Sequence, residues 1–208
     1  MSLNYEELNE RQLVAETDEF TAERYRQFAA LLPKTCFKIL DVGCSTGRGG
    51  AELKRIRPLI QLHGFDCSEK RLAQLPEAYE GRHCGDVRKM PFEDEEFDAV
   101  LMGEFIEHLY PHDVDPCLFE TQRILRVGGR VLLTTPNPNG WKKRLLQSTI
   151  YTTSHLSQHF PEILKLRLRM SGFSRVTLCG SGKSTRFIGS KIPLLNLYGS
   201  FLIHGDKI

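Results

Sequence analysis

The sequence predicts an α/β fold, with a doubly wound, mostly parallel, seven-stranded sheet and helices on both of its faces. Two observations predict this fold. Short apolar runs, typical of buried strands, alternate with helical segments through most of the 208 residues. The first apolar run leads directly into a glycine-rich turn, as the first strand of a doubly wound fold does. Alternation of this kind indicates β-α-β units, in which helices connect parallel strands.

The first half of the chain gives these elements in order. Residues 4–32 are predicted to be helical, and Pro33 ends that segment. The run FKILDVG at 37–43 is a buried strand entering a tight turn, and a helix then runs from 48 until Pro58 stops it. A strand at 60–66 and a helix at 68–75 follow, with Ser68 placed as the N-cap of that helix.

The second half continues the alternation. Helices are predicted over 113–126 and within 159–173, where Gly172 stands at a C-cap position. The remaining strands are predicted at 81–86, 95–103, 128–136, 174–180 and 197–205. Segment 136–156 is too long for a simple connection, and such segments often form covers or binding loops.

Composition excludes several classes of protein. The chain is 40% hydrophobic and 26% charged, which is typical of a globular domain and not of a disordered one. It has no apolar run long enough for a transmembrane helix, and the polar, acidic start MSLNYEELNER resembles neither a signal nor a transit peptide. We therefore expect a cytoplasmic protein whose six cysteines are reduced thiols. No CxxC pair is present, so a structural zinc site is not expected.

Charge is unevenly distributed along the chain, although the net charge is only +2. Residues 1–35 carry a net charge of −3, residues 36–140 carry −4, and residues 141–208 carry +9. The basic residues gather at 142–144 and at 165–169. Such asymmetry suggests an anionic partner, although a solvated helix face and loop would explain it equally well.

The turn after the first strand, in ILDVGCSTGRGGAEL, is the main candidate for ligand binding. Gly43, Gly47 and Gly49 let the backbone turn sharply, and the following helix offers its free N–H groups. The spacing G-x-x-x-G-x-G disfavours NAD, and a phosphate-binding loop would need a lysine that is missing here. S-adenosylmethionine remains, and Asp66 at the end of the next strand can hydrogen-bond ribose hydroxyls.

At these residues the chain resembles the class I S-adenosylmethionine-dependent methyltransferases, particularly the ubiquinone-biosynthesis type of O-methyltransferase. The resemblance covers residues 37–135 well, through LDVGCSTG, GFDCS, GDVRKMPFEDEEFDAV, VLMGEFIEHL and ILRVGGRVLLTTPN. It implies a Rossmann-like methyltransferase fold and S-adenosylmethionine as the cofactor. The residues that it implies for the cofactor are Asp41, Gly43, Cys44, Ser45, Gly47, Asp66, Cys67, Asp86, Val87 and Gly103.

Each of these roles has a simpler alternative. An acidic residue at a strand end often caps the next helix, and Cys44 and Cys67 are small lining residues more readily than reactive thiols. Ser45 departs from the family, which often has glycine there. A serine makes a left-handed backbone costlier but adds a hydroxyl for the cofactor carboxylate.

GEFIEHL, after the fourth strand, holds Glu104, Glu107 and His108. If it opens a helix, Glu104 and Glu107 share a face, and His108 lies one turn after Glu104. The pattern resembles the metal site of small-RNA 3′-terminal 2′-O-methyltransferases, with His155 or His159 as the later histidine. The same pattern in ubiquinone-type enzymes is also a common way of packing the strand end. We predict no metal and take His108 as the catalytic base.

A second glycine-rich stretch, GSGKS at 180–184, mimics a phosphate-binding loop. The earlier glycine of that motif is missing, since Thr177 stands there, so a loop with an exposed Lys183 is expected instead.

These predictions combine into one expected enzyme. Residues 1–208 form a single methyltransferase domain, with a helical cover at 1–35, a cofactor-binding core at 36–135 and an acceptor-side part at 136–208. The expected acceptor is a small, saccharide- or lipid-linked hydroxyl compound near the basic groups. RNA is a less favoured acceptor, because the chain shows no RNA-binding module and its pI is about 8.2. A non-catalytic cofactor-binding module is the remaining alternative, and the sequence does not give the oligomeric state.

Overall fold

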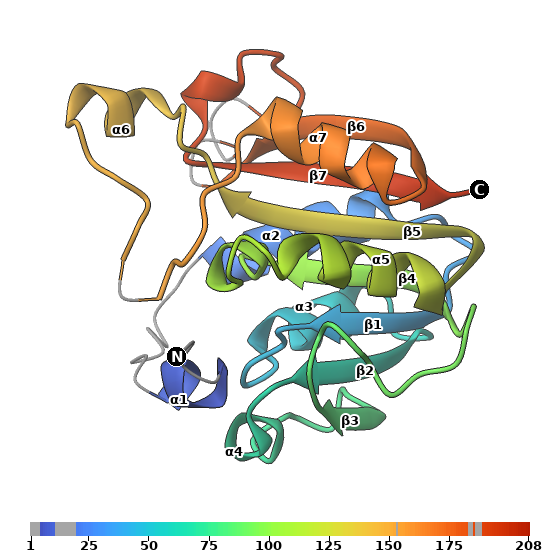
Figure 1. Ribbon diagram of the computed structural model, residues 1–208. Helices are drawn as coiled ribbons and strands as arrows, with labels where there is room; N and C mark the ends of the chain where they lie inside the picture. The colour runs from blue at the N-terminus through green and yellow to red at the C-terminus, as the bar shows by residue number, and fades with distance from the viewer. Residues whose placement is uncertain (1–4, 11–19, 153, 183–184, 186–188) are drawn as a thin grey trace.

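Seven strands form a single sheet in the computed structural model, which describes residues 5–10, 20–152, 154–182, 185 and 189–208 (Figure 1). The strand order is β3-β2-β1-β4-β5-β7-β6, and β7 alone runs against its neighbours. The strands are β1 (Lys38–Val42), β2 (Gln61–Asp66), β3 (Gly81–Cys84), β4 (Phe97–Gly103), β5 (Leu125–Pro136), β6 (Phe173–Ser181) and β7 (Ser200–Lys207). The predicted doubly wound, mostly parallel sheet is therefore confirmed.

Helices cover both faces of this sheet (Figure 1). They are α1 (Tyr5–Glu10), α2 (Phe20–Leu31), α3 (Arg48–Ile56), α4 (Glu69–Leu72), α5 (Val114–Ile124), α6 (Trp141–Leu145) and α7 (Pro161–Met170), with single 3-10 turns η1 (Ile106–His108) and η2 (Leu195–Leu197). None of the described helices is long and apolar enough to cross a membrane.

Several predicted boundaries differ from the structure. The predicted helix at 4–32 contains α1 and α2, and its residues 11–19 lie outside the described part of the chain. The predicted helix at 68–75 is the single turn α4, although Ser68 does cap it by accepting from the backbone N–H of Arg71. The chain leaves α5 at Ile124 and enters β5 at once.

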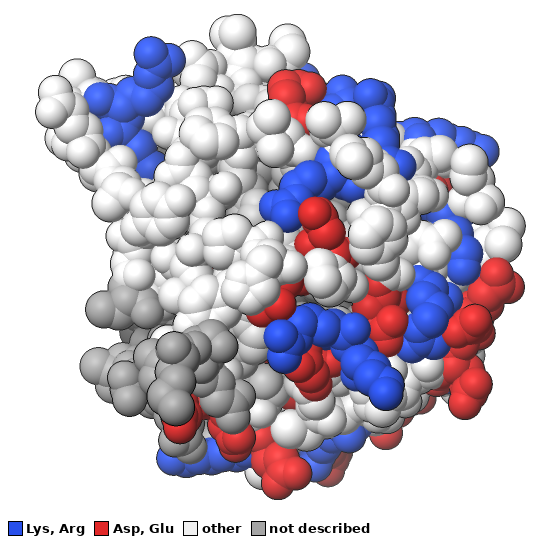
Figure 2. Space-filling view, in the orientation of Figure 1, with Lys and Arg blue, Asp and Glu red and all other residues white. Residues whose placement is uncertain are grey.

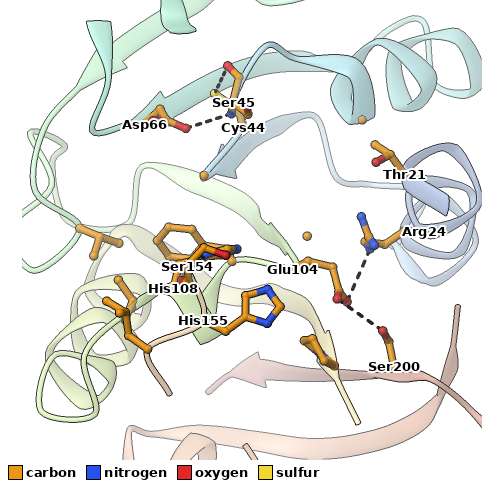
Figure 3. A pocket seen from close by; sticks show the side chains of 18 of the residues that line it. Thr21, Arg24, Cys44, Ser45, Asp66, Glu104, His108, Ser154, His155 and Ser200 are labelled. Carbon is orange, nitrogen blue, oxygen red and sulfur yellow. Dashed lines mark hydrogen bonds and ion pairs between the residues drawn. The ribbon is translucent and has the colours of Figure 1, made fainter. Parts of the chain in front are cut away.

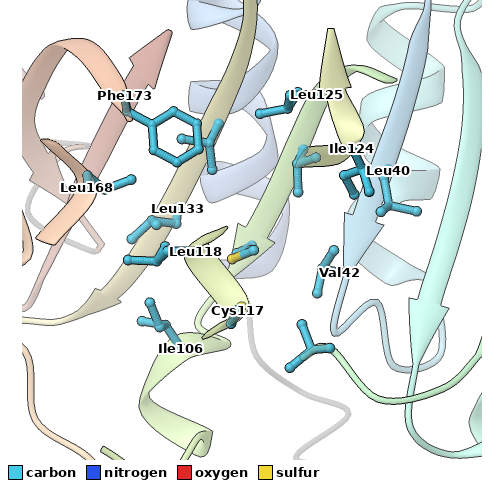
Figure 4. Packing of buried hydrophobic residues seen from close by; sticks show 14 of the residues in the cluster. Leu40, Val42, Ile106, Cys117, Leu118, Ile124, Leu125, Leu133, Leu168 and Phe173 are labelled. Atoms are coloured by element: carbon cyan, nitrogen blue, oxygen red, sulfur yellow. The ribbon is translucent and has the colours of Figure 1, made fainter. Parts of the chain in front are cut away.

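The core lies in two layers because side chains alternate across the strands. Leu40 and Val42 of β1 join the layer under α5 and α7, which also contains Leu118 and Leu168 (Figure 4). Ile39, which precedes Leu40 in the sequence, faces the opposite layer under α2 and α3. Burial on both faces explains why these strands read as continuous apolar runs rather than as alternating ones.

The carboxyl ends of β1, β2 and β4 meet at one edge of the sheet, where the connecting loops and α1 gather (Figure 1). Tyr5 of α1 is tied to this edge, since its hydroxyl donates to the carboxylate of Asp113 and accepts from the N–H of Tyr110 at 3.0 Å. Ligands of open α/β sheets bind outside the carboxyl ends of the strands, so this edge is the expected place for a site.

Candidate active site

A large cavity of about 1180 Å³ opens at this edge of the sheet. Its wall combines the β1–α3 turn, the end of β2, the loop after β3, the end of β4, the segment 136–156 and parts of α1, α2 and β7. The predicted residues that line it are Gly43, Cys44, Ser45, Asp66, Cys67, Asp86, Val87, Gly103 and His108. Residues up to 65 positions apart in the sequence, Gly43 and His108, are thus brought together in one site, and Figure 3 shows Asp66, Ser45 and His108 around it.

The β1–α3 turn has the backbone that its glycines predicted. Gly43 has φ of +68°, and a Cβ there would lie 2.2 Å from Cδ2 of Phe105, so both conformation and space require glycine. Ser45 has φ of +51°, the left-handed conformation that is costly for serine. Its hydroxyl is buried in the cavity wall and has no hydrogen-bond partner among the described residues. A strained residue with an unpartnered polar atom at a cavity is a candidate for ligand contact.

Asp66 connects the two loops at the cavity. One carboxylate oxygen accepts from the backbone N–H of Ser45 at 2.9 Å, and the other accepts from the N–H of Ser68 at 3.0 Å (Figure 3). Asp66 therefore holds both loops and also lines the cavity, so the capping and the binding interpretations are compatible.

Two predicted cofactor residues do not line the cavity. Asp41 is fully buried, and its carboxylate accepts from the hydroxyls of Tyr25, at 2.6 Å, and of Tyr79. Burial raises the pKa of Asp41 to about 6. Tyr25 does line the cavity, so Asp41 is connected to the cavity only through the hydrogen bond from the Tyr25 hydroxyl. Gly47 caps α3 with φ of +81° and packs against Leu75, Pro76 and Tyr79.

The adenine-side prediction involved Asp86 and Val87. Both line the cavity, with Val87 buried and Asp86 exposed. Arg88 donates from its backbone N–H at 2.8 Å and from its guanidinium to the Asp86 carboxylate, and this pairing lowers the pKa of Asp86. Arg88 also reaches Asp113 at 3.2 Å, which links this loop to the residue that holds α1.

Of the two pocket cysteines in the motifs, Cys44 is buried and Cys67 is partly exposed. The pKa of the Cys44 thiol is raised well above its usual range, chiefly by burial, so the thiol is protonated and unreactive at neutral pH. All six cysteines fall within the described residues, and none forms a disulfide.

His108 lies in the cavity wall with a defined tautomer. Its Nδ1 lies 2.8 Å from the carbonyl oxygen of Ser154, and because a carbonyl only accepts, Nδ1 carries the proton. Nε2 is then the basic nitrogen of a neutral ring. Burial, aided by the neighbouring His155, lowers the pKa of His108 to about 4, so the imidazole is neutral at pH 7. The ring is thus oriented and neutral, and a pKa of about 4 makes it a weaker base than a free imidazole in the protein without ligand.

The Glu-x-x-Glu-His segment does not form the predicted α-helix. It is the 3-10 turn η1, and Glu104 before it has φ of +53°. Glu104 turns toward Arg24, 3.8 Å away, and accepts from the hydroxyl of Ser200 at 3.4 Å (Figure 3). The predicted α-helix was therefore wrong, because Glu104 has a left-handed backbone and lies before the turn begins.

Glu107 instead meets two histidines. One potential ligand atom each of Glu107, His108 and His155 lies within 4.8 Å of the others. Glu107 is fully buried, its carboxyl has no hydrogen-bond partner among the described residues, and burial together with Glu104 raises its pKa. His155 is the later histidine of this cluster. His159 is not, since its Nε2 contacts the hydroxyl of Ser157 at 2.8 Å and the carbonyl of Ile106 at 3.3 Å.

The structure brings in residues that the sequence did not single out. Tyr5, Thr21, Arg24 and Tyr25 come to the wall from the amino-terminal helices, and Ser200 comes from β7. These segments showed only apolar spots or strand character in the sequence. Nothing in them indicated which side chains would face a cavity formed by distant loops.

The basic carboxyl-terminal third lies only partly at the cavity. Lys143 and Trp141 of the 136–156 segment line it, as do His155 and Gly182. The 165–169 group is elsewhere, on α7, where Arg167 pairs with Asp115 at 2.7 Å. Residues 165–169 do not line this cavity, because α7 packs on the α5 side of the sheet, so an acceptor near this group stays a prediction. Lys183 lies outside the described residues.

Comparisons with known proteins agree with this geometry. Residues 40–133 match a family model described as a methyltransferase domain. Over 122 residues the chain is 33% identical to malonyl-[acyl-carrier protein] O-methyltransferase of Herminiimonas arsenicoxydans, covering 59% of this chain and 45% of that protein. Over 179 residues it is 28% identical to fatty-acid O-methyltransferase of Mycolicibacterium smegmatis, covering 78% and 63%. The chain thus spans less than two thirds of these relatives.

A solved structure supports the fold over nearly the whole chain. The S-adenosylmethionine-dependent methyltransferase from Archaeoglobus fulgidus superposes with a TM-score of 0.69 at 24% identity, covering 89% of this chain and 92% of that one. Together with the match at residues 40–133, this confirms the resemblance drawn from the motifs. Residues 40–133 therefore match a methyltransferase domain, and the chain has the fold of the S-adenosylmethionine-dependent methyltransferases.

Proposed function

We propose that this chain transfers a methyl group from S-adenosylmethionine to a hydroxyl oxygen of a small, saccharide- or lipid-linked acceptor. One observation carries the proposal: a single cavity holds both the motif residues for the cofactor and a neutral, oriented histidine. The two relatives above are named as O-methyltransferases of acyl compounds, which supports an oxygen acceptor.

The residues of the cavity fit the proposed cofactor. The unpartnered Ser45 hydroxyl is placed for the carboxylate of its methionine part, and Asp66 lies in the cavity wall at the position proposed for the ribose hydroxyls. Asp86 and Val87 would contact the adenine. Arg88 would then lose part of its hydrogen bonding to the Asp86 carboxylate. When bound, S-adenosylmethionine supplies an electrophilic methyl group with a neutral thioether as its leaving group.

The remaining task of the protein is to align an acceptor and to remove its proton. Alignment by the cavity wall is a large effect, because well-oriented pairs reach effective molarities on the order of 10⁵ M or more. The Ser154 carbonyl holds the His108 ring by Nδ1, which leaves Nε2 to take the proton of an acceptor hydroxyl. A carboxylate acceptor would already be ionised at pH 7 and would not need this base.

The test is a screen for methyl transfer from labelled S-adenosylmethionine, with the wild-type chain and the His108→Gln variant. Hydroxyl lipids, hydroxyl-bearing saccharides, fatty acids and total RNA are tested separately. The proposal expects label in a hydroxyl acceptor and a loss of turnover of about a hundredfold or more in the variant. Label in fatty acids alone, with His108→Gln unaffected, would replace the hydroxyl proposal by a carboxyl one.

A second candidate is a metal-assisted RNA 2′-O-methyltransferase, and the Glu107–His108–His155 cluster favours it. One carboxylate with two imidazoles suits Zn²⁺ or Mn²⁺. A divalent cation would displace the proton that burial keeps on Glu107. Transfer to RNA that stops on chelation and returns with added metal would support this candidate, and chelator-insensitive activity would remove it.

A further inference from the structure

Helix α6 projects from the body of the molecule and carries large apolar side chains in solvent (Figure 1). Leu145 and Leu146 are each 73% exposed, and Trp141 is 46% exposed. Tyr151, farther along the same segment, is also exposed. Clusters of exposed apolar side chains on a projection are costly in water and commonly mark an interaction surface.

The start of α7 extends this apolar surface. Arg144 of α6 and Phe160 and Pro161 at the start of α7 line one small groove, so the two helices are neighbours. Ile163, Leu166 and Met170 of α7 are exposed and share one helix face at i, i+3 and i+7. The opposite side of α7, with Leu164 and Leu168, is already buried against the sheet. The outer stripe of α7 is therefore not needed for the core.

Positive charge accompanies this surface. Figure 2 shows lysine and arginine atoms among uncharged ones on the projection that corresponds to α6. From residue 141 onward the sequence has eleven basic residues and two acidic ones. Arg144 is exposed on α6, and Arg169 is exposed beside the apolar stripe of α7. Leucine, tryptophan and tyrosine with flanking cations are typical of helices that lie in the interface of an anionic bilayer.

We propose that the α6–α7 surface, defined by Trp141, Leu145, Leu146, Ile163, Leu166 and Met170, docks onto a bilayer that contains anionic lipids. The apolar side chains enter the headgroup boundary, while Arg144 and Arg169 meet lipid phosphates. Trp141 and Lys143 also line the cavity, so docking brings the cavity wall to the bilayer. A lipid-linked acceptor can then enter from the membrane. This last step rests on the proposed function, but the docking itself does not.

The chain provides its own probe for the test, because Trp141 is its only tryptophan. The wild-type chain is titrated with phosphatidylcholine vesicles with and without phosphatidylglycerol, while tryptophan emission and co-sedimentation are recorded. We expect binding and a blue shift of Trp141 emission only with the anionic lipid. Arg144→Gln should weaken binding about fivefold, which corresponds to about 1 kcal/mol for one cation near such a surface. Leu145→Ser/Leu146→Ser should weaken it about tenfold or more.

Matched controls lie at the opposite edge of the sheet. Leu59 precedes β2 and is 83% exposed, and Lys34 is exposed before β1. Leu59→Ser and Lys34→Gln should bind vesicles as the wild-type chain does. Because all these side chains are exposed, the variants are expected to fold, and circular dichroism checks this.

Several results would overturn the proposal. One is an unchanged Trp141 emission with anionic vesicles, and another is vesicle binding by Leu145→Ser/Leu146→Ser equal to that of the wild-type chain. A third is sedimentation that shows a dimer of the wild-type chain but a monomer of this variant. Binding of a purified acidic acyl carrier protein without vesicle binding would also overturn it. S-adenosylmethionine titration and methyl transfer to a water-soluble acceptor are also measured on the wild-type chain. Absence of both would count against the proposed function, whereas their presence without vesicle binding would count against docking alone.

Discussion

Replacing Asp66 with alanine separates the structural and the binding roles of this carboxylate. In the free protein, Asp66→Ala leaves the backbone N–H groups of Ser45 and Ser68 without their acceptor. An orphaned buried donor costs about 1–3 kcal/mol, so unfolding should become easier by about 2–6 kcal/mol in total. Two further hydrogen bonds, from ribose hydroxyls to a charged acceptor, would be lost only in the complex.

These ligand bonds set the expected change in affinity. Each hydrogen bond to a charged group is worth about 1.5–3 kcal/mol, so two of them give about 3–6 kcal/mol. The Kd for S-adenosylmethionine should therefore rise by about two to four orders of magnitude. Isothermal titration calorimetry measures this change, and urea denaturation measures the stability. Asp66→Asn, which keeps one oxygen, should lie between the wild-type chain and Asp66→Ala in both.

Asp98 provides a matched control. It is also buried, and its carboxylate accepts from the backbone N–H groups of Phe37 at 2.6 Å and Lys38 at 2.9 Å, but it does not line the cavity. Asp98→Ala should lose comparable stability and keep the wild-type Kd for S-adenosylmethionine. The reasoning is refuted if Asp66→Ala binds within about threefold of wild type, or if Asp98→Ala loses affinity to the same extent.

Three other predictions concern the same site. In Gly43→Ala, the alanine would need a positive φ, and its Cβ would press against the Phe105 ring. The variant should therefore have a lower melting temperature and bind S-adenosylmethionine at least about tenfold more weakly. Wild-type values for both would contradict the turn geometry. The pKa of His108 and of His159 is about 4 in the fold against 6.5 in the unfolded chain, so the unfolded chain binds more protons between these values. Stability should be complete above pH 6.5 and fall as the pH drops toward 4, by on the order of 3 kcal/mol for each group, and urea midpoints that stay constant over this window would contradict it. Glu107→Gln should stabilise the chain or leave it unchanged in metal-free buffer, because burial already favours the neutral acid, whereas loss of bound zinc measured by atomic absorption would show that the carboxylate is a ligand.

Much of the fold was predictable because it follows from local sequence patterns. The predicted runs at 37–43, 60–66 and 95–103 contain β1, β2 and β4, and their continuous apolar character follows from burial on both faces. The glycines of the first turn predicted its left-handed backbone at Gly43. Ser68 capped α4 as expected.

Other features depend on contacts between distant segments. The acidic end of β1 suggested that Asp41 touches a ligand, but Tyr25 of α2 and Tyr79 after α4 take up its carboxylate. Neither tyrosine lies near Asp41 in sequence. That His155 and not His159 joins the Glu107 cluster likewise depends on a distant contact. The backbone N–H groups of Leu156 and Ser157 both donate to the carbonyl of Glu107, which holds segment 154–157 against η1.

Short elements were also hard to predict. Helix α6 is a five-residue helix inside a segment that showed only loop character, and η1 replaced a predicted α-helix. Helices of this length gain little from propensity and are set by tertiary contacts. The division of the chain at residues 35 and 135 stays a prediction.

Cofactor binding in the cavity is the central claim, and calorimetric titration of the wild-type chain with S-adenosylmethionine tests it most directly. The account predicts saturable binding of one molecule per chain, with wild-type affinity retained by Asp98→Ala and lost by Asp66→Ala. Absence of saturable binding to the folded wild-type chain would contradict it.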